Sequence, residues 1–165
     1  ADGIVTKTER IAFKNIFTIS PGDEKQVDYI FQLAQNDIAG FDIYAKKISK
    51  MLSKHPKLLE NLIEGLLYIS IADGVFHPNE EIFIDEVASI FKISSKKLTI
   101  LKARYIPELQ NNPFLVLGLS PQTEFKEIKK QWQKLVQQSH PDNLIAQGLP
   151  QEAINLATSR LIAIN

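Results

Sequence analysis

The sequence predicts an all-α fold, and three observations support that prediction. Apolar residues recur at steps of three and four in nearly every segment, which is the spacing of an amphipathic helix. No segment alternates apolar and polar residues as a half-buried strand does, and no Asn-Gly hairpin turn occurs. Proline, glycine and asparagine interrupt the periodic segments at short intervals. Such a succession of helices and turns is typical of a helical bundle.

Six apolar stripes mark the helices that we expect before residue 106. They cover residues 11–19, 27–34, 43–52, 58–71, 87–91 and 98–105. The stripe over 58–71 is the densest, so we expect it to be a central and mostly buried helix. Turns are expected at the breakers between stripes, which are Ser20-Pro21-Gly22, residues 36–40 and His55-Pro56.

Charge and composition narrow the function. Lysine plus arginine equals aspartate plus glutamate at 19 each, so no overall field favours nucleic acid as a partner, and electrostatic recognition requires a local patch. The absence of cysteine excludes disulfides and thiolate metal sites and favours a reducing, cytoplasmic setting. No apolar run approaches the roughly 18 residues of a membrane-spanning helix. We therefore expect this chain itself to be soluble.

Both ends of the sequence look cut. The chain starts without methionine at Ala1-Asp2-Gly3, a pattern typical of the end of a helix. At the other end the helical period of apolar residues continues through Leu161 and Ile164 to the last residue, without a stop signal. These features predict a fragment of a longer protein.

A short motif occurs twice. Residues 1–9, Ala-Asp-Gly-Ile-Val-Thr-Lys-Thr-Glu, recur as residues 72–80, Ala-Asp-Gly-Val-Phe-His-Pro-Asn-Glu. Each copy places a glycine past a helix end, then two apolar residues, then the cap of the next helix. Thr6 and Glu9 have the spacing of a capping box. The repeat resembles the TerB-like helical domain, over about residues 1–105, which implies a helical domain that binds partners.

The acidic residues of the repeat allow a second interpretation. A divalent cation could be held by Asp73, His77, Glu80 and Glu81, together with Asp2. Helix capping explains the same residues, and the ligand series of a calcium loop is missing, so we assign no metal ligand.

Residues 106–113 contain two prolines and several side-chain amides and are expected to join two domains. We therefore predict a TerB-like helical domain over 1–107, a linker over 108–111 and a second domain over 112–165.

The second domain should begin with a short helix that Gly118 ends, followed by a long helix from Thr123 to about Ser139. We expect one face of the long helix to pack on Phe114 and Leu117, with Trp132 in the core. That face consists of Phe125, Ile128, Trp132, Leu135 and Val136. The opposite face carries four lysines, the lysine strip, which are Lys126, Lys129, Lys130 and Lys134.

The tripeptide His140-Pro141-Asp142 follows the long helix. Proline lacks an amide hydrogen and biases the preceding residue away from helical geometry, so the chain should turn outward and expose both flanking side chains. A polar loop over 143–150 and a second amphipathic helix from Gln151 should follow. The two helices would form an antiparallel hairpin that displays the tripeptide near its tip.

This second domain resembles the J domain of DnaJ-type co-chaperones. The resemblance covers Phe-Leu-Val-Leu-Gly-Leu at 114–119, residues 128–135, His140-Pro141-Asp142 and the helix that follows, all in order. It implies a J-domain helical hairpin, truncated at its C-terminus, in which the tripeptide and the lysine strip bind a DnaK-type chaperone and stimulate its ATP hydrolysis. Trp132 stands where the family usually has tyrosine, and Gln133 and Gln138 stand where many of its members have basic residues.

The loop over 144–150 and the order of the two domains resemble the membrane-anchored DnaJ-like co-chaperones that carry a TerB-like domain. The resemblance implies a role in protein folding or stress response, with unfolded client proteins as further partners. It also implies a membrane anchor upstream of Ala1, through which a homodimer could form, and a location at the cytoplasmic face of the bacterial inner membrane. No catalytic residue and no cofactor is implied.

Two other functions compete with this interpretation. A hydrolase could use His140 as a base oriented by Asp142, but residues two apart across a proline rarely reach that geometry, and no nucleophile motif accompanies them. We therefore do not expect an enzyme. The main alternative is a TerB-type stress-response or metal-response binding module whose J-like segment is degenerate.

Overall fold

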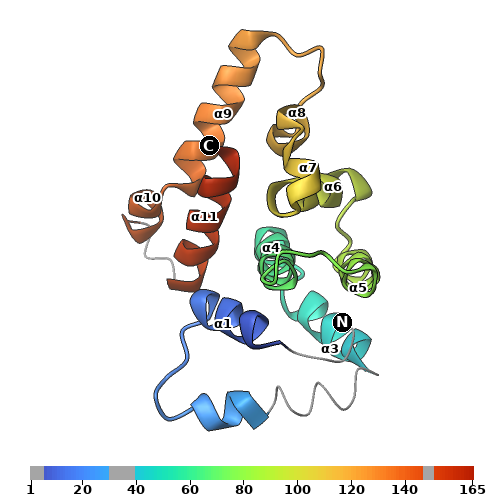
Figure 1. The fold of residues 1–165 in the computed structure, drawn as a ribbon, viewed down its shortest axis with the longest axis vertical. Helices are drawn as coiled ribbons and strands as arrows, with labels where there is room; N and C mark the ends of the chain where they lie inside the picture. Colours follow the sequence, from blue (N-terminus) through green and yellow to red (C-terminus); the bar gives the residue numbers. More distant parts are fainter. Residues whose placement is uncertain (1–5, 30–39, 147–150) are drawn as a thin grey trace. The chain divides into compact units, whose positions relative to one another are not determined.

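The computed structural model describes residues 6–29, 40–146 and 151–165. All regular elements in those ranges are helices, which confirms the predicted all-α fold (Figure 1). They are α1 (Lys7–Ile16), α3 (Phe41–Met51), α4 (Pro56–Ser70), α5 (Pro78–Ile90), α6 (Ser95–Tyr105), α7 (Pro107–Gln110), α8 (Pro113–Leu117), α9 (Phe125–Ser139), α10 (Pro141–Ala146) and α11 (Gln151–Ile164). Residues 24–29 are also helical, and the rest of the stripe predicted over 27–34 lies outside the described residues.

The chain divides into two compact units, residues 1–94 and 95–165. Helix α6 packs with α7 and α8 in the second unit. From the sequence we expected residues 95–105 in the first domain. Residues 107–110, expected as part of the junction, form a short helix that Pro107 begins. Proline suits the first position of a helix because the amide hydrogen that it lacks would have no partner there. The domain boundaries at 107 and 111 stay predictions.

The first unit is built around α4, which contacts α1 and α5. Leu59, Ile63 and Leu67 of α4 are buried, as the dense stripe over 58–71 predicts. Helix α5 faces them with buried Ile84 and Val87 and also contacts α3. Burial of each such aliphatic side chain is worth about 1.5 to 3 kcal/mol, so this apolar contact is the main stabilisation of the unit.

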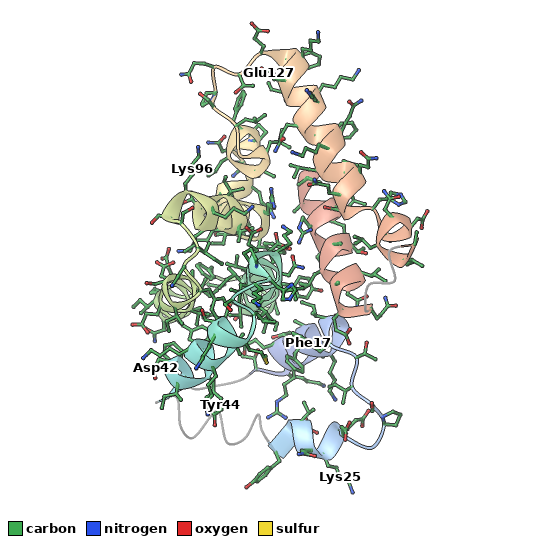
Figure 2. All side chains as sticks on the ribbon, turned by 180° about the vertical axis from the view of Figure 1, so that it is seen from behind. Phe17, Lys25, Asp42, Tyr44, Lys96 and Glu127 are labelled. Carbon is green, nitrogen blue, oxygen red and sulfur yellow. The ribbon has the colours of Figure 1, made fainter. Side chains whose placement is uncertain are left out.

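The side of α3 that faces its unit differs from the one predicted. Ile43 and Met51 are 54% and 72% exposed, although the stripe over 43–52 places them in the core. The buried residue of α3 is Ala45, and Ile48 is half-buried. Tyr44, 68% exposed, points outward from α3 (Figure 2). Half-buried Phe41 lies on the same side of α3 as Ala45 and Ile48, and its ring contacts that of Phe83 on α5 with centroids 4.9 Å apart, so α3 turns this side toward its unit.

The second unit combines the short helices α7 and α8 with the longer α6, α9 and α11. Helices α9 and α11 lie side by side and run in opposite directions, and α10 contacts both (Figure 1). Buried Ala103, Val116 and Ile164 form one core cluster, onto which Leu135 and Val136 of α9 pack. The predicted antiparallel pair is therefore present, and residues from α6 and α8 hold it from one side.

Gly118 ends α8 in the left-handed conformation, with φ +73°. Its backbone N–H donates to the carbonyl of Leu115 at 3.0 Å, and the N–H of Leu119 donates to that of Phe114 at 2.7 Å. Both bonds satisfy carbonyls that the helix end would otherwise leave without a donor. A Cβ atom at Gly118 would lie 3.0 Å from Cδ1 of Ile100 on α6. The predicted glycine cap is confirmed, and it also allows close packing of α6.

We predict that Gly118→Ala destabilises the folded chain by about 1 to 2 kcal/mol, because a left-handed alanine is strained. The Cβ contact with Ile100 adds to that cost. Urea unfolding followed by circular dichroism measures the loss. Gly22→Ala is the matched control, since a Cβ there meets nothing within 4 Å and its φ is not positive. Equal stability of the two variants would contradict this explanation.

Candidate functional site

Helix α9 carries most of the residues that the sequence assigns to partner binding. Its sequence over 125–139 is rich in lysine, glutamine and glutamate, which favour helix, and contains neither glycine nor proline. The helix begins at Phe125, with Glu124 as its N-cap, close to the start predicted at Thr123. Glu127 lies in its first turn, at the opposite end of α9 from α10 (Figure 2). It ends at Ser139, as predicted.

His140 forms the sharp end of α9. Its backbone is extended, with φ −69° and ψ 125°, as expected for a residue before proline. The backbone N–H of Asp142 donates to Nδ1 of His140 at 3.3 Å, and Nδ1 lies 3.7 Å from Oδ2 of Asp142. The side chains of His140 and Asp142 are 47% and 85% exposed. The tripeptide is thus a turned, solvent-exposed tip, which is the geometry predicted from the sequence.

The segment after the tip corrects the prediction of a loop over 143–150. Residues 141–146 form helix α10, and residues 147–150 lie outside the described part of the chain. Pro141 occupies the first turn, where its fixed φ suits a helix, and Asp142 adds a negative charge near the positive end of the helix dipole. Leu144 is 8% exposed and packs with Ile154 and Ala157 of α11. An apolar anchor in a mostly polar segment was not recognised in the sequence.

Asn143 is a second residue of this region that the sequence analysis does not single out. Its side-chain amide donates from Nδ2 to the backbone carbonyl of Gln137 at 2.9 Å. Its backbone N–H also donates to the carbonyl of His140 at 3.1 Å. The available signal was the residue type, because asparagine commonly bonds to nearby backbone, but its partner could not be derived from spacing.

The lysine strip lies on the exposed side of α9. Lys126, Lys129, Lys130 and Lys134 are all exposed, and at 100° per residue they fall within roughly 140° of the helix circumference. Within the described residues none of the four forms an ion pair with a carboxylate of the chain. A set of unpaired lysines on one helix face can attract an acidic surface, and such attraction is screened by salt.

The predicted apolar face of α9 is only partly correct. Ile128, Leu135 and Val136 are half-buried, but Phe125 is 79% exposed and Trp132 is 38% exposed. At 100° per residue Trp132 lies between buried Ser139 and half-buried Val136, so its exposure does not follow from its place around the helix. Trp132 is therefore not the core residue that we expected, and α9 exposes two aromatic side chains in addition to the lysine strip.

Ser139 is the most buried residue of α9, at 1% exposure, and its hydroxyl has no hydrogen-bond partner among the described residues. An unpaired buried hydroxyl costs folding free energy, about 1 to 3 kcal/mol. The side chain is small enough for α9 to lie close to its neighbours directly before the tip.

The repeated motif forms helix caps in the part that can be described. Thr6 and Glu9 form the predicted capping box, with the N–H of Thr6 donating to Glu9 at 2.6 Å and the N–H of Glu9 to Thr6 Oγ1 at 3.2 Å. In the second copy the N–H of His77 donates to Glu80 at 2.9 Å. Asp73 accepts from the N–H of Val75 at 2.9 Å and lies 3.4 Å from Nε2 of His77.

Three of the candidate cation residues, Asp73, His77 and Glu80, are engaged in those contacts. Asp2 lies outside the described residues, and within them no three histidine or acidic side chains gather as a metal site would require. Burial raises the pKa of Glu80, the N–H bond from His77 lowers it, and the charge of Glu9 raises it further. Glu9 and Glu80 occupy equivalent places in the two copies of the motif. The effect of Glu9 on the pKa of Glu80 shows that the folded chain brings these two like charges within electrostatic range.

The described residues thus define an all-α protein with a basic helix and an exposed His-Pro-Asp tip. Comparison with protein families matches residues 1–103 to the family described as tellurite resistance protein TerB. This match covers more than half of the chain, and the chain belongs to that family.

Several characterised relatives are named co-chaperone protein DjlA. The protein of Vibrio parahaemolyticus is 25% identical over 132 residues, which cover 62% of this chain and 46% of the relative. That of Escherichia coli K12 is 28% identical over 126 residues, with the same coverage of both chains. That of Coxiella burnetii is 44% identical over 50 residues, or 30% of this chain and 18% of the relative. The chain therefore spans less than half the length of these relatives, and no solved structure matches it.

None of the helices in the described ranges has the length and apolar character needed to cross a membrane.

We predict that Glu80→Gln stabilises the chain increasingly as pH rises. Burial raises the pKa of Glu80 in the folded chain. The folded chain therefore loses stability as pH rises through that pKa and the carboxyl group ionises. Glutamine keeps an oxygen that can accept from His77 but cannot ionise. Urea unfolding between about pH 4 and pH 7 measures the difference from the unaltered chain. Glu86→Gln, an exposed site on the same helix, is the control; parallel curves for Glu80→Gln and the unaltered chain would refute the prediction.

Proposed function

We propose that this chain is part of a DnaJ-type co-chaperone, in which residues 112–165 act as a J domain on a DnaK-type ATPase. The observation that carries the proposal is the exposed tip of His140, Pro141 and Asp142 at the end of a helix whose four strip lysines are exposed and form no ion pair within the described residues. The relatives named co-chaperone protein DjlA support it. The proposal assigns binding to this chain and ATP hydrolysis to its partner.

The lysine strip and the tip have separate tasks in this mechanism. Lys126, Lys129, Lys130 and Lys134 attract an acidic surface of the partner and orient α9 on it, which raises the rate of encounter. The tip then presents the imidazole of His140 and the carboxylate of Asp142 to the partner, and this carboxylate can accept a bidentate pair of hydrogen bonds from an arginine. Pro141 restricts the backbone between the two groups, so less conformational freedom is lost on docking.

The chain performs this role without a catalytic centre or cofactor of its own. His140 and Asp142 contact each other, but the hydroxyl of the neighbouring Ser139 is buried and has no hydrogen-bond partner among the described residues, so no serine–histidine bond supports a hydrolase. Their shared task is to shift the partner toward the conformation that hydrolyses ATP, and that shift requires tighter binding to that conformation.

The setting of the protein is part of the same proposal. By analogy with its co-chaperone relatives, we place the chain at the cytoplasmic face of the bacterial inner membrane, held by an anchor outside the sequence given. Unfolded client proteins would reach the DnaK-type partner there, and homodimers would form through the anchor. The TerB-like region would contribute partner binding.

A second candidate function follows from the family match over residues 1–103. In it the chain is a TerB-type stress-response or metal-response binding module, and the J-like segment no longer acts on a chaperone. Calorimetric titration with calcium, magnesium and zinc, compared with Asp73→Ala, separates the two. Heat that depends on Asp73, without ATPase stimulation, would favour this module over the co-chaperone.

We predict that the protein stimulates single-turnover ATP hydrolysis by its cognate DnaK-type chaperone and that His140→Gln abolishes the stimulation. Glutamine keeps hydrogen-bonding atoms but not the imidazole geometry, while α9 and α11 keep their packing because the ring is half-exposed. His55→Gln, an exposed histidine before Pro56 in the first unit, is the matched control. Stimulation by His140→Gln equal to that of the unaltered protein would refute the role of the tip.

We predict that Lys129→Glu with Lys130→Glu slows association with the ATP-bound chaperone by about tenfold or more at low salt, because two steering charges are reversed. The difference should shrink as salt rises, since the Debye length falls to about 8 Å at physiological ionic strength. Stopped-flow fluorescence measures the rate. The control is Lys50→Glu on α3, an exposed lysine outside the strip. Equal effects of the control and the double variant would exclude steering by the strip.

A further inference from the structure

We infer that Asn143 is a positioning residue for the His-Pro-Asp tip, which it clamps to the last turn of α9. The inference rests on the proposed function for its consequence, but the clamp itself is a geometric feature of the chain. Asn143 is the first residue after the tripeptide, and its side chain reaches back to a residue that precedes the tripeptide.

The clamp closes a short ring of backbone around the tip. Nδ2 of Asn143 donates to the carbonyl of Gln137 at 2.9 Å, and its backbone N–H donates to the carbonyl of His140 at 3.1 Å. The N–H of Leu144 also reaches that carbonyl, at 3.4 Å. The bond to Gln137 therefore spans six residues, and the whole tripeptide lies inside the ring that it closes.

The carbonyl of Gln137 needs a donor from outside its helix. The last four carbonyls of a helix have no partner in the helix itself, and Pro141, which lacks an N–H, lies four residues after Gln137. Asn143 supplies the donor that Pro141 cannot. Pro141 therefore leaves the carbonyl of Gln137 without a helical donor, and the side chain of Asn143 donates to it instead.

Leu144 fixes the other side of the tip. Its side chain is buried against Ile154 and Ala157, so α10 is held to α11 directly after Asn143. The tip is consequently held at two places, by a polar bond to α9 and by an apolar contact to α11. A site held in one geometry by its supporting residues loses less freedom when a partner binds.

The substitution Asn143→Asp tests the clamp with little change in shape. Aspartate has no donor for the carbonyl of Gln137, and its carboxylate is repelled by that carbonyl oxygen. Asn143→Lys is the rescue variant, because an ammonium group donates hydrogen bonds and is favoured at a helix C-terminus. Asn79→Asp is the matched control: Asn79 is an exposed asparagine in the first turn of α5, after Pro78.

The first measurement is independent of any chaperone. Nitrogen-15 relaxation of the backbone amides of Asp142 and Asn143 should give order parameters near 0.85 in the unaltered chain and below about 0.6 in Asn143→Asp. Asn143→Lys should restore them, and Asn79→Asp should leave them unchanged. Order parameters that do not respond to Asn143→Asp would overturn the clamp.

The second measurement is the titration of ATPase stimulation, with the DnaK-type chaperone as the probe. A lost bond of about 1 kcal/mol should lower the maximal stimulation by Asn143→Asp about fivefold, while the half-saturating concentration, set by the lysine strip, changes less than about twofold. Because the lost bond also lowers the melting temperature by a few degrees, the variants are compared well below it, where circular dichroism shows each to be folded.

The outcomes separate the inference from the proposed function. If the unaltered protein stimulates the chaperone and Asn143→Asp stimulates equally, the positioning role is wrong and the co-chaperone function stands. If the unaltered protein does not stimulate at all, the proposed function is wrong and the positioning role falls with it. Reduced maximal stimulation by Asn143→Asp, with rescue by Asn143→Lys, supports both.

Discussion

The antiparallel packing of α11 on α9 is the constraint on which the rest of the candidate site depends. It orients α9 so that Leu135 and Val136 face the core cluster and the lysine strip faces solvent. It also provides the surface, at Ile154 and Ala157, on which Leu144 is buried. Helix α10 contacts both long helices, so residues 141–146 are held against the pair. The exposed His140 and Asp142 are therefore followed directly by a segment that buried Leu144 anchors to α11.

Position, rather than composition, gives this chain its basic surface. The formal net charge is zero, so a general attraction to polyanions is not expected. Four lysines that form no ion pair within the described residues nevertheless share one side of α9, and the same helix exposes Phe125 and Trp132. A surface of this kind selects a partner that offers acidic and apolar groups together, and charge then contributes more to the rate and orientation of binding than to its free energy.

Local rules predicted those features that depend on only a few neighbouring residues. The capping box of Thr6, the glycine cap at Gly118 and the break before Pro141 each follow from the conformational limits of single residue types, and the structure shows them. Helix orientation was harder, because the apolar residues of α3 and α9 allow more than one buried face. The most buried residues of the two helices are small Ala45 and Ser139, which the spacing of large apolar residues does not reveal. The anchor at Leu144 required knowledge of where α11 lies.

The most direct test of the central claim is a map of the surface that the partner contacts. Amide chemical shifts of the isotope-labelled chain, recorded with and without the ATP-bound DnaK-type chaperone, provide it. We predict that the chemical-shift changes concentrate at the tip over 140–143 and at the lysine strip, and that added salt removes them. The strip residues are Lys126, Lys129, Lys130 and Lys134. Changes confined to residues 6–94, or none at concentrations that stimulate hydrolysis, would contradict the claim that the tip and the strip form the docking surface.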